Sequence, residues 1–188
     1  KLSDIFAANK TFAPGDTIFL RNGIHGSVTV KGNNTDFVVI MPQEGHFPLI
    51  SSLTVSAARY WKLYKLLVQS EGNTTSGKPT AYLVTFNSTA KDITLSNCTI
   101  ASNLNTTNWT RTDWRTRAKN GIQTSAQLNS NYIIEDNLFK NVAFGIIISS
   151  SNCIVRRNTL QNFTLDASRI IASDVLFEGN KIYDLYKC

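Results

Sequence analysis

The sequence is poor in cysteine, proline, charge and long apolar runs. Three cysteines in 188 residues are too few for a disulfide-stapled miniprotein, and ten glycines with four prolines exclude a collagen-like chain. No segment approaches the roughly 18 consecutive apolar residues of a membrane-spanning helix. Only 17% of the residues are charged, but 42% are hydrophobic, which is ordinary for a folded chain. We therefore expect one domain with its own core, spanning residues 1–188.

Metal ligands are also scarce and scattered. The cysteines Cys98, Cys153 and Cys188 form no Cys-x-x-Cys pair, and both histidines, His25 and His46, lie far from them in the sequence. We expect no metal site and no cofactor. The odd cysteine count allows at most one internal disulfide and leaves its pairing open.

The net charge of +6 is spread along the chain rather than gathered in a nucleic-acid-binding module. We therefore expect no nucleic-acid partner.

Asparagine, by contrast, is abundant and sits in glycosylation sequons. Eight Asn-x-Ser/Thr triplets occur, roughly twice the number that the composition gives by chance, which points to a secreted, extracellular glycoprotein. We predict glycans at Asn9, Asn33, Asn73, Asn87, Asn105, Asn108 and Asn162. The chain begins at Lys1 and its single Met is Met41, so we expect a processed chain or an excised fragment.

An internal repeat is the strongest signal in the sequence. Four β-rich segments each carry an Asn followed by a large apolar residue, and these asparagines are Asn97, Asn137, Asn158 and Asn180. The last two steps are 21 and 22 residues, and the 40-residue step corresponds to one repeat plus an insertion. A degenerate copy, Trp61–Val68, has Leu66 at the Asn position.

Short β-branched runs separated by turn residues fill the rest of each repeat. They are Thr17–Leu20, Val28–Val30, Phe37–Ile40, Leu53–Val55, Tyr82–Phe86, Gly145–Ile148 and Arg169–Ala172. Such small repeats must stack to bury their apolar faces. The sequence therefore predicts an all-β parallel β-helix, a solenoid of about seven coils.

Two local features complete this fold prediction. A short helix over about Ser3–Asn9, with Ser3 as its N-cap, would close one end within an N-terminal cap of residues 1–12. The repeated asparagines would form an inward hydrogen-bonded ladder. We place Asn97 in that ladder and expect it to stay unmodified although it is a sequon.

Residues Ala13–Gly23 resemble the opening strand that follows the capping helix in polysaccharide lyases of the chondroitinase B and alginate lyase type. Tyr60–Val68 resembles their next recurring strand, and Asn141–Asp184 resembles their central coils. The resemblance implies a right-handed β-helix acting on acidic polysaccharide, with a Lys and an Arg on adjacent coils as acid and base.

The match to lyase chemistry is incomplete. The nearest candidates are Lys140, Asp166 and Arg169, with Arg156 and Arg157 nearby, and Asp166–Arg169 resembles an Asp-Gly-x-Arg turn of related proteins. No matched Lys–Arg pair can be assigned, so we assign no catalytic residue. In the proteins that it resembles, the active coil follows the stretch that matches Tyr183–Cys188, where this chain ends.

Simpler structural roles compete for the same residues. Asp166 and Arg169 would form a salt bridge within a turn, and Lys140 would face solvent. Arg156 and Arg157 cannot both face outward on one strand, so one of them would sit in a turn.

Two insertions interrupt the repeat, at residues 71–80 and 101–119. The first is a plain Gly/Ser/Thr loop. The second combines aromatic and basic residues, and its candidate binding residues are Trp109, Arg111, Trp114, Arg115 and Arg117. Three interpretations stay open: stacking on sugars with pairing to carboxylates or sulfates, a protein interface, or a glycosylated loop folded back on its own solenoid.

Two hypotheses of function follow. The first is an extracellular, N-glycosylated, non-catalytic β-helix protein that is a self-assembling structural or filament-forming subunit or a surface glycan-binding module. The second is the N-terminal part of a polysaccharide lyase acting on acidic polysaccharide, with its active coil beyond residue 188. Unsaturated uronate absorbance on incubation with acidic glycans would distinguish the second from the first.

Overall fold

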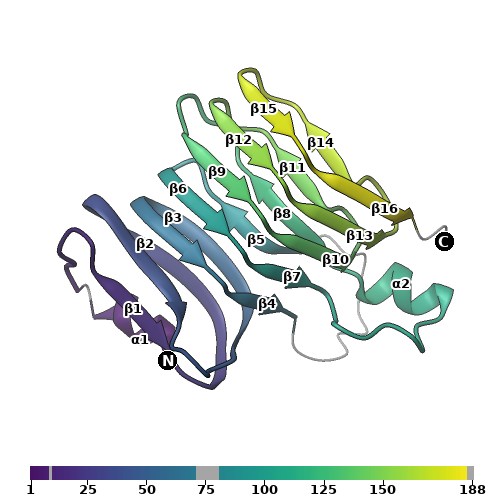
Figure 1. Cartoon of the computed structure of the whole chain (residues 1–188), viewed down its shortest axis with the longest axis horizontal. Helices are drawn as coiled ribbons and strands as arrows, with labels where there is room; N and C mark the ends of the chain where they lie inside the picture. Colours follow the sequence, from purple (N-terminus) through teal and green to yellow (C-terminus); the bar gives the residue numbers. More distant parts are fainter. Residues whose placement is uncertain (9, 71–80, 186–188) are drawn as a thin grey trace.

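A computed structural model describes residues 1–8, 10–70 and 81–185. Within them the chain forms a short N-terminal helix and then parallel strands of a single, strongly curled sheet (Figure 1). This parallel-stranded, curled arrangement is consistent with the predicted β-helix or solenoid-like fold. Asn9, Asn73, Cys188 and the insertion at 71–80 lie outside the described residues.

The strands fall into three stacks, and the chain visits the stacks in a fixed order. The first stack contains β1 (Thr17–Leu20), the ends of β2 (Gly23–Pro42) and β3 (Pro48–Tyr64), and then β6 (Ala90–Ser96), β9 (Tyr132–Glu135), β12 (Cys153–Arg156) and β15 (Val175–Glu178). The second contains the beginnings of β2 and β3 and then β4 (Leu67–Gln69), β7 (Thr99–Ala101), β10 (Leu138–Val142), β13 (Thr159–Phe163) and β16 (Lys181–Leu185). The third contains the middles of β2 and β3 and then β5 (Tyr82–Phe86), β8 (Asn120–Thr124), β11 (Ile146–Ile148) and β14 (Ser168–Ile170).

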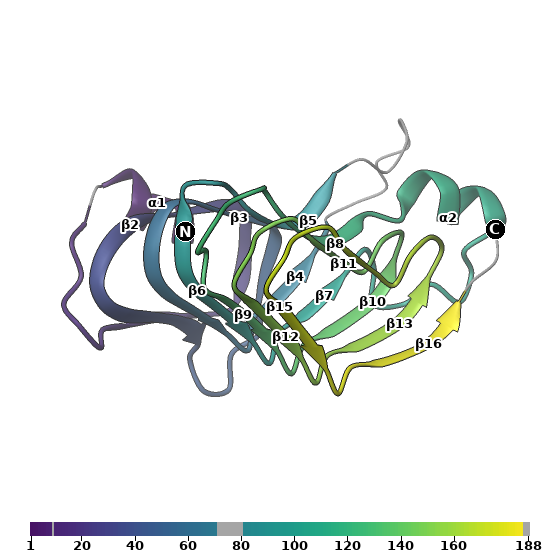
Figure 2. The same cartoon turned by 90° about the horizontal axis from the view of Figure 1, so that it is seen from above.

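Alternating side chains of all three stacks point into one continuous core. On the first stack, Trp61, Ile93 and Tyr132 lie in register above one another and are fully buried. Successive side chains of a strand face opposite sides of the sheet, so one apolar residue in two suffices to fill the interior. Figure 2 shows the chain curling around this interior.

The helix α1 (Leu2–Ala7) closes the N-terminal end of the core. Leu2 is buried within its first turn, and the ring of Phe6 packs edge-on against Trp61 at 5.6 Å. The predicted capping helix is therefore present, but its predicted start is wrong. Burial of Leu2 draws that residue into the helix, so Ser3 lies inside it and is not the N-cap.

The corner between the first and second stacks is built from residues in the left-handed backbone region. Lys65, Asn97, Asp136, Arg157 and Gly179 occupy equivalent positions in successive coils, with φ between +54° and +60°. Such a φ bends the chain sharply at a single residue. Arg157 thus sits in a turn, as predicted, while Arg156 faces outward from β12.

An inward ladder of asparagine amides follows this corner directly. The Oδ1 of Asn158 accepts from the backbone N–H of Asn137 at 3.0 Å, and the Oδ1 of Asn180 accepts from that of Asn158 at 2.9 Å. Each amide nitrogen also donates across the coil, as Asn158 Nδ2 does to the carbonyl of Ile134 at 2.8 Å. The predicted ladder is confirmed at positions 137, 158 and 180.

Asn97 does not belong to this ladder, and the predicted alignment is wrong by one residue. Strand register places Cys98, not Asn97, beside Asn137, and Asn97 is an exposed corner residue with φ +56°. The alignment missed this because Asn97 occupies the corner position that Asp136 fills in the next coil. Burial therefore gives no reason for Asn97 to escape glycosylation.

The thiol of Cys98 takes the place of the amide in its coil. Its Sγ accepts from the backbone N–H of Leu66 at 3.4 Å and donates to the carbonyl of Leu63 at 3.5 Å, which are the two functions of each Asn amide. Cys153 is also buried, and its thiol lies 3.3 Å from the hydroxyl of Ser130. Both cysteines are free rather than joined in a disulfide.

We expect both thiols to be unreactive in the native protein. Burial raises the pKa of Cys98 to about 12 and also raises that of Cys153, and the thiolate is the reactive form. A Cys188→Ser variant treated with Ellman's reagent should release no thiol signal at pH 8 until urea unfolds it, and then two equivalents. A native signal of one equivalent or more would contradict the buried ladder position.

Candidate functional site

The aromatic-basic insertion forms a compact helical loop on the corner between the second and third stacks. It contains α2 (Arg111–Arg117), which begins at the N-cap Thr110. The Thr110 hydroxyl accepts from the backbone N–H of Asp113 at 3.2 Å, and the Asp113 carboxylate accepts from the backbone N–H of Thr110 at 2.9 Å. This capping box explains how seven residues hold a helix in a surface loop. Figure 1 shows α2 beside the carboxyl ends of β10 and β13.

The insertion is folded back on the coils that carry it. Trp114 is buried against Ala118 and Ala143, and Trp109 packs edge-on against Trp114 at 5.1 Å. The Oγ of Ser102 accepts from the backbone N–H of Lys119 at 2.7 Å, so the two ends of the insertion are tied together. This packing agrees with the folding back of the third interpretation, but it tests neither the glycosylation in that interpretation nor the sugar-stacking and interface interpretations.

Two asparagines of successive coils continue the surface beside this loop. Asn141 and Asn162 are equivalent corner residues with φ of +54° and +53°, and Asn162 Nδ2 donates to Asn141 Oδ1 at 3.1 Å. Asn141 Nδ2 donates in turn to the carbonyl of Asn103 at 2.7 Å. This second, shorter ladder anchors the start of the insertion to the neighbouring coils.

A cleft of about 330 Å³ lies between the loop and this corner, and we call it the tryptophan cleft. Its lining residues are Thr106, Thr107, Trp109, Trp114, Asn141 and Asn162. Two of the five predicted binding residues, Trp109 and Trp114, therefore come together here. Arg111 and Arg115 are exposed on α2 and do not line it.

The other walls of the cleft were not predicted to contact a ligand. Asn141 and Asn162 follow the insertion by more than 20 residues and reach the cleft only through coil stacking. Their spacing of 21 residues equals the repeat step and is the signal that could have paired them.

The positive charge nearest the tryptophans is neutralised. Arg117 donates to Asp113 at 2.9 Å, and its guanidinium lies 5.1 Å from the centre of the Trp109 ring. The hydrogen bond from Arg117, with those from Thr110, lowers the pKa of Asp113 to about 2. The carboxylate is therefore charged at any physiological pH, and Arg117 stands beside Trp109 as half of an ion pair.

The weak catalytic candidates do not form a site together. Arg169 pairs with Asp166 at 2.8 Å, which confirms the predicted turn salt bridge, and its guanidinium lies 4.9 Å from the centre of the Phe144 ring. Lys140 lies on β10 in another stack, and no contact between described residues joins it to either. Arg156 and Arg157 pair with Glu135, and Arg157 also pairs with Asp136.

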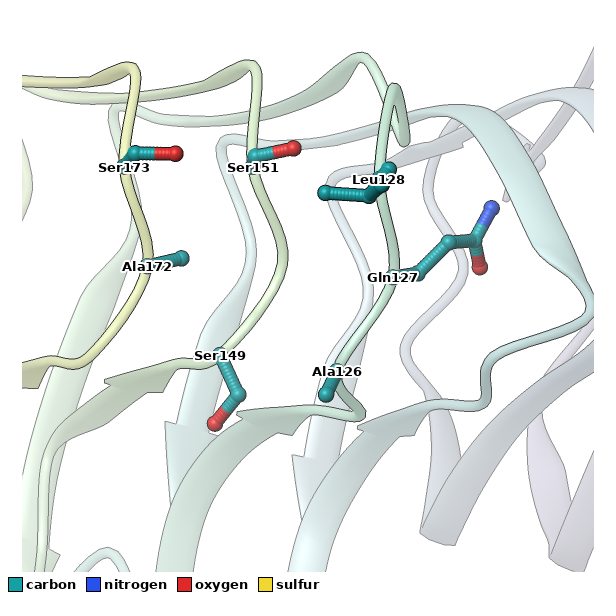
Figure 3. Close-up of a pocket in the computed structure, with 7 residues that line it drawn as sticks. All are labelled: Ala126, Gln127, Leu128, Ser149, Ser151, Ala172 and Ser173. Carbon is teal, nitrogen blue, oxygen red and sulfur yellow. The ribbon is translucent and has the colours of Figure 1, made fainter.

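Two larger clefts have other linings. One, of about 480 Å³, is lined by small residues of three successive turns, with Leu128 beside them and the side chain of Gln127 directed away from them (Figure 3). The other, of about 590 Å³, opens between the exposed Phe19 and Phe47 near the N-terminal end. Among these three clefts of the described residues, the tryptophan cleft alone joins indole rings to side-chain amides, so we treat it as the candidate site although it is the smallest of the three.

Over residues 1–8, 10–70 and 81–185, no cluster of three His, Cys, Asp or Glu side chains has the geometry to hold a metal ion. None of the helices in that part of the chain has the length and apolar character to cross a bilayer.

Comparisons of the chain with protein-family models, with curated proteins and with solved structures found no match. The resemblance to β-helix lyases therefore rests on the segments Ala13–Gly23, Tyr60–Val68 and Asn141–Asp184 alone.

Proposed function

We propose that the chain is a right-handed parallel β-helix of about seven coils that acts as a secreted, N-glycosylated, non-catalytic glycan-binding module. The three stacks, visited in a fixed order, and the helix α1 over one end support the solenoid. The proposed glycosylation is supported by the exposure of three sequon asparagines, Asn33, Asn105 and Asn108.

The tryptophan cleft is the observation that carries the binding function. Trp109 lines the cleft and is partly exposed, so its indole can contact the C–H groups of a sugar ring. The amide of Asn162 and the hydroxyl of Thr107 can hydrogen-bond to the hydroxyls of that sugar. The wall of the cleft combines two indole rings with hydroxyl and amide groups, which suits a ligand that has both C–H surface and hydroxyl groups. The buried Trp114 fixes the position of Trp109 from behind.

The glycan-binding role rests on a cleft that the structure contains, so we place it before the filament-forming role of the same hypothesis. The lyase alternative places its active coil beyond residue 188, so the ion pairs of Arg156, Arg157 and Arg169 neither support nor exclude it.

We expect Trp109→Ala to weaken glycan binding about tenfold or more, because one stacking surface contributes more than about 1.4 kcal/mol, the equivalent of tenfold. A glycan array followed by titration calorimetry on the tightest ligand measures this. Arg111→Ala, on α2 but outside the cleft, is the matched control and should bind like the parent chain. Equal affinity of parent and Trp109→Ala would rule out the cleft as the binding site.

A further inference from the structure

Resting on the proposed function, the geometry points to an uncharged pyranose ring as the ligand of the tryptophan cleft, in place of the acidic sugar that the resemblance to lyases implies. Every lining side chain is neutral: two threonines, two tryptophans and two asparagines. A carboxylate or sulfate placed there would lose water without gaining a free cation, which is costly.

The neighbouring charges strengthen this argument. The guanidinium of Arg117 lies over the ring of the lining residue Trp109, and Asp113 already accepts a hydrogen bond from Arg117. Arg111 and Arg115 lie on the exposed surface of α2, where a single ion pair contributes little and is screened by salt. Selection for anionic sugars would need one of these guanidinium groups in the cleft wall.

The hydrogen-bonding groups that remain suit hydroxyl groups. The Oδ1 of Asn162 and the hydroxyls of Thr106 and Thr107 have no protein partner within residues 1–8, 10–70 and 81–185, so they can accept from or donate to a sugar. Asn141, in contrast, is occupied on both amide atoms and forms fixed structure. Ligand contacts therefore gather around Trp109 and Asn162.

Such a ring can come from two sources. One is an external glycan, and the other is the first sugar of a glycan on the chain itself, because Asn162 lines the cleft and begins the sequon Asn162-Phe163-Thr164. Attachment at Asn162 would place a neutral N-acetylated pyranose beside Trp109. In both cases the cleft holds the same chemistry.

The first arm of the test uses unglycosylated protein from a bacterial host. We expect neutral oligosaccharides to bind, with an affinity that changes less than about twofold between about 50 and 500 mM NaCl and falls about tenfold or more in Trp109→Ala. An Arg111→Ala/Arg115→Ala double variant should bind unchanged. Salt-sensitive binding of acidic glycans that this double variant abolishes would overturn the neutral ligand while leaving glycan binding in place.

The second arm uses protein from a glycosylating host and measures tryptophan emission with glycopeptide mass spectrometry. Thr164→Ala removes the sequon and leaves the Asn162 side chain, whereas Thr164→Ser preserves the sequon. A glycan on Asn162, with an emission spectrum that Thr164→Ala alters and Thr164→Ser does not, would identify the chain's own glycan as the occupant. Absence of neutral binding in the first arm, together with unaltered emission in the second, would overturn both this inference and the proposed function.

Discussion

Replacing Asn158 by leucine should lower the free energy of unfolding by roughly 3–5 kcal/mol. Asn158 is fully buried, and its amide accepts from Asn137 and donates to the carbonyl of Ile134. Leucine has a similar size but no polar atom, so at least one N–H and one carbonyl would be left buried without a partner. Urea unfolding followed by circular dichroism measures the loss.

The surface substitution Asn33→Leu controls for the chemical change alone. Asn33 is exposed, so its replacement should change the free energy of unfolding by less than about 0.5 kcal/mol. An Asn158→Leu protein as stable as this control would show that the ladder adds no stability.

The substitution Gly145→Ala should destabilise the chain by roughly 3 kcal/mol through crowding of adjacent coils. A Cβ at this position would lie 2.3 Å from the carbonyl oxygen of Ala167 and 2.6 Å from Leu160 Cδ2. A Cβ added at Gly121, one coil earlier, would lie at the same 2.3 Å from the carbonyl oxygen of Gly145. Glycine is therefore required here by the close approach of the next coil, since neither residue has a positive φ.

Ala167 occupies the equivalent position in the next coil and provides the control. Ala167→Gly relieves no contact with a further described coil, so its effect should stay within about 1 kcal/mol. Thermal unfolding of both variants under identical conditions compares them. A Gly145→Ala variant with the same unfolding temperature as the parent chain would show that adjacent coils can move apart at this corner without loss of stability.

The sequence predicted the fold where its repeat is regular. Steps of 21 and 22 residues keep Asn137, Asn158 and Asn180 in register, so spacing alone places them above one another. The step from Cys98 to Asn137 contains the insertion, and nothing in its length shows where coil and loop meet. Sequence similarity then favoured Asn97 over Cys98. The thiol of Cys98 makes the hydrogen bonds of a ladder asparagine, but a cysteine does not resemble an asparagine in the sequence.

The candidate site was predicted only where it is local. Trp109 and Trp114 stand out by composition within one loop, but composition does not show that Arg117 is held by Asp113 or that Arg111 faces solvent. Asn141 and Asn162 reach the cleft through packing between coils, which depends on register and not on proximity in the chain.

The even spacing of the ladder also bears on how the chain can fold. Partners in it are separated by 21 residues for Asn137 and Asn158, by 22 for Asn158 and Asn180, and by 39 across the insertion. Loop-closure entropy grows only with the logarithm of length, so the longer segment costs roughly 0.5 kcal/mol more than a plain coil. Strand pairing can therefore proceed from one coil to the next, and the insertion that carries the tryptophan cleft adds little to the entropic cost of closing the coils.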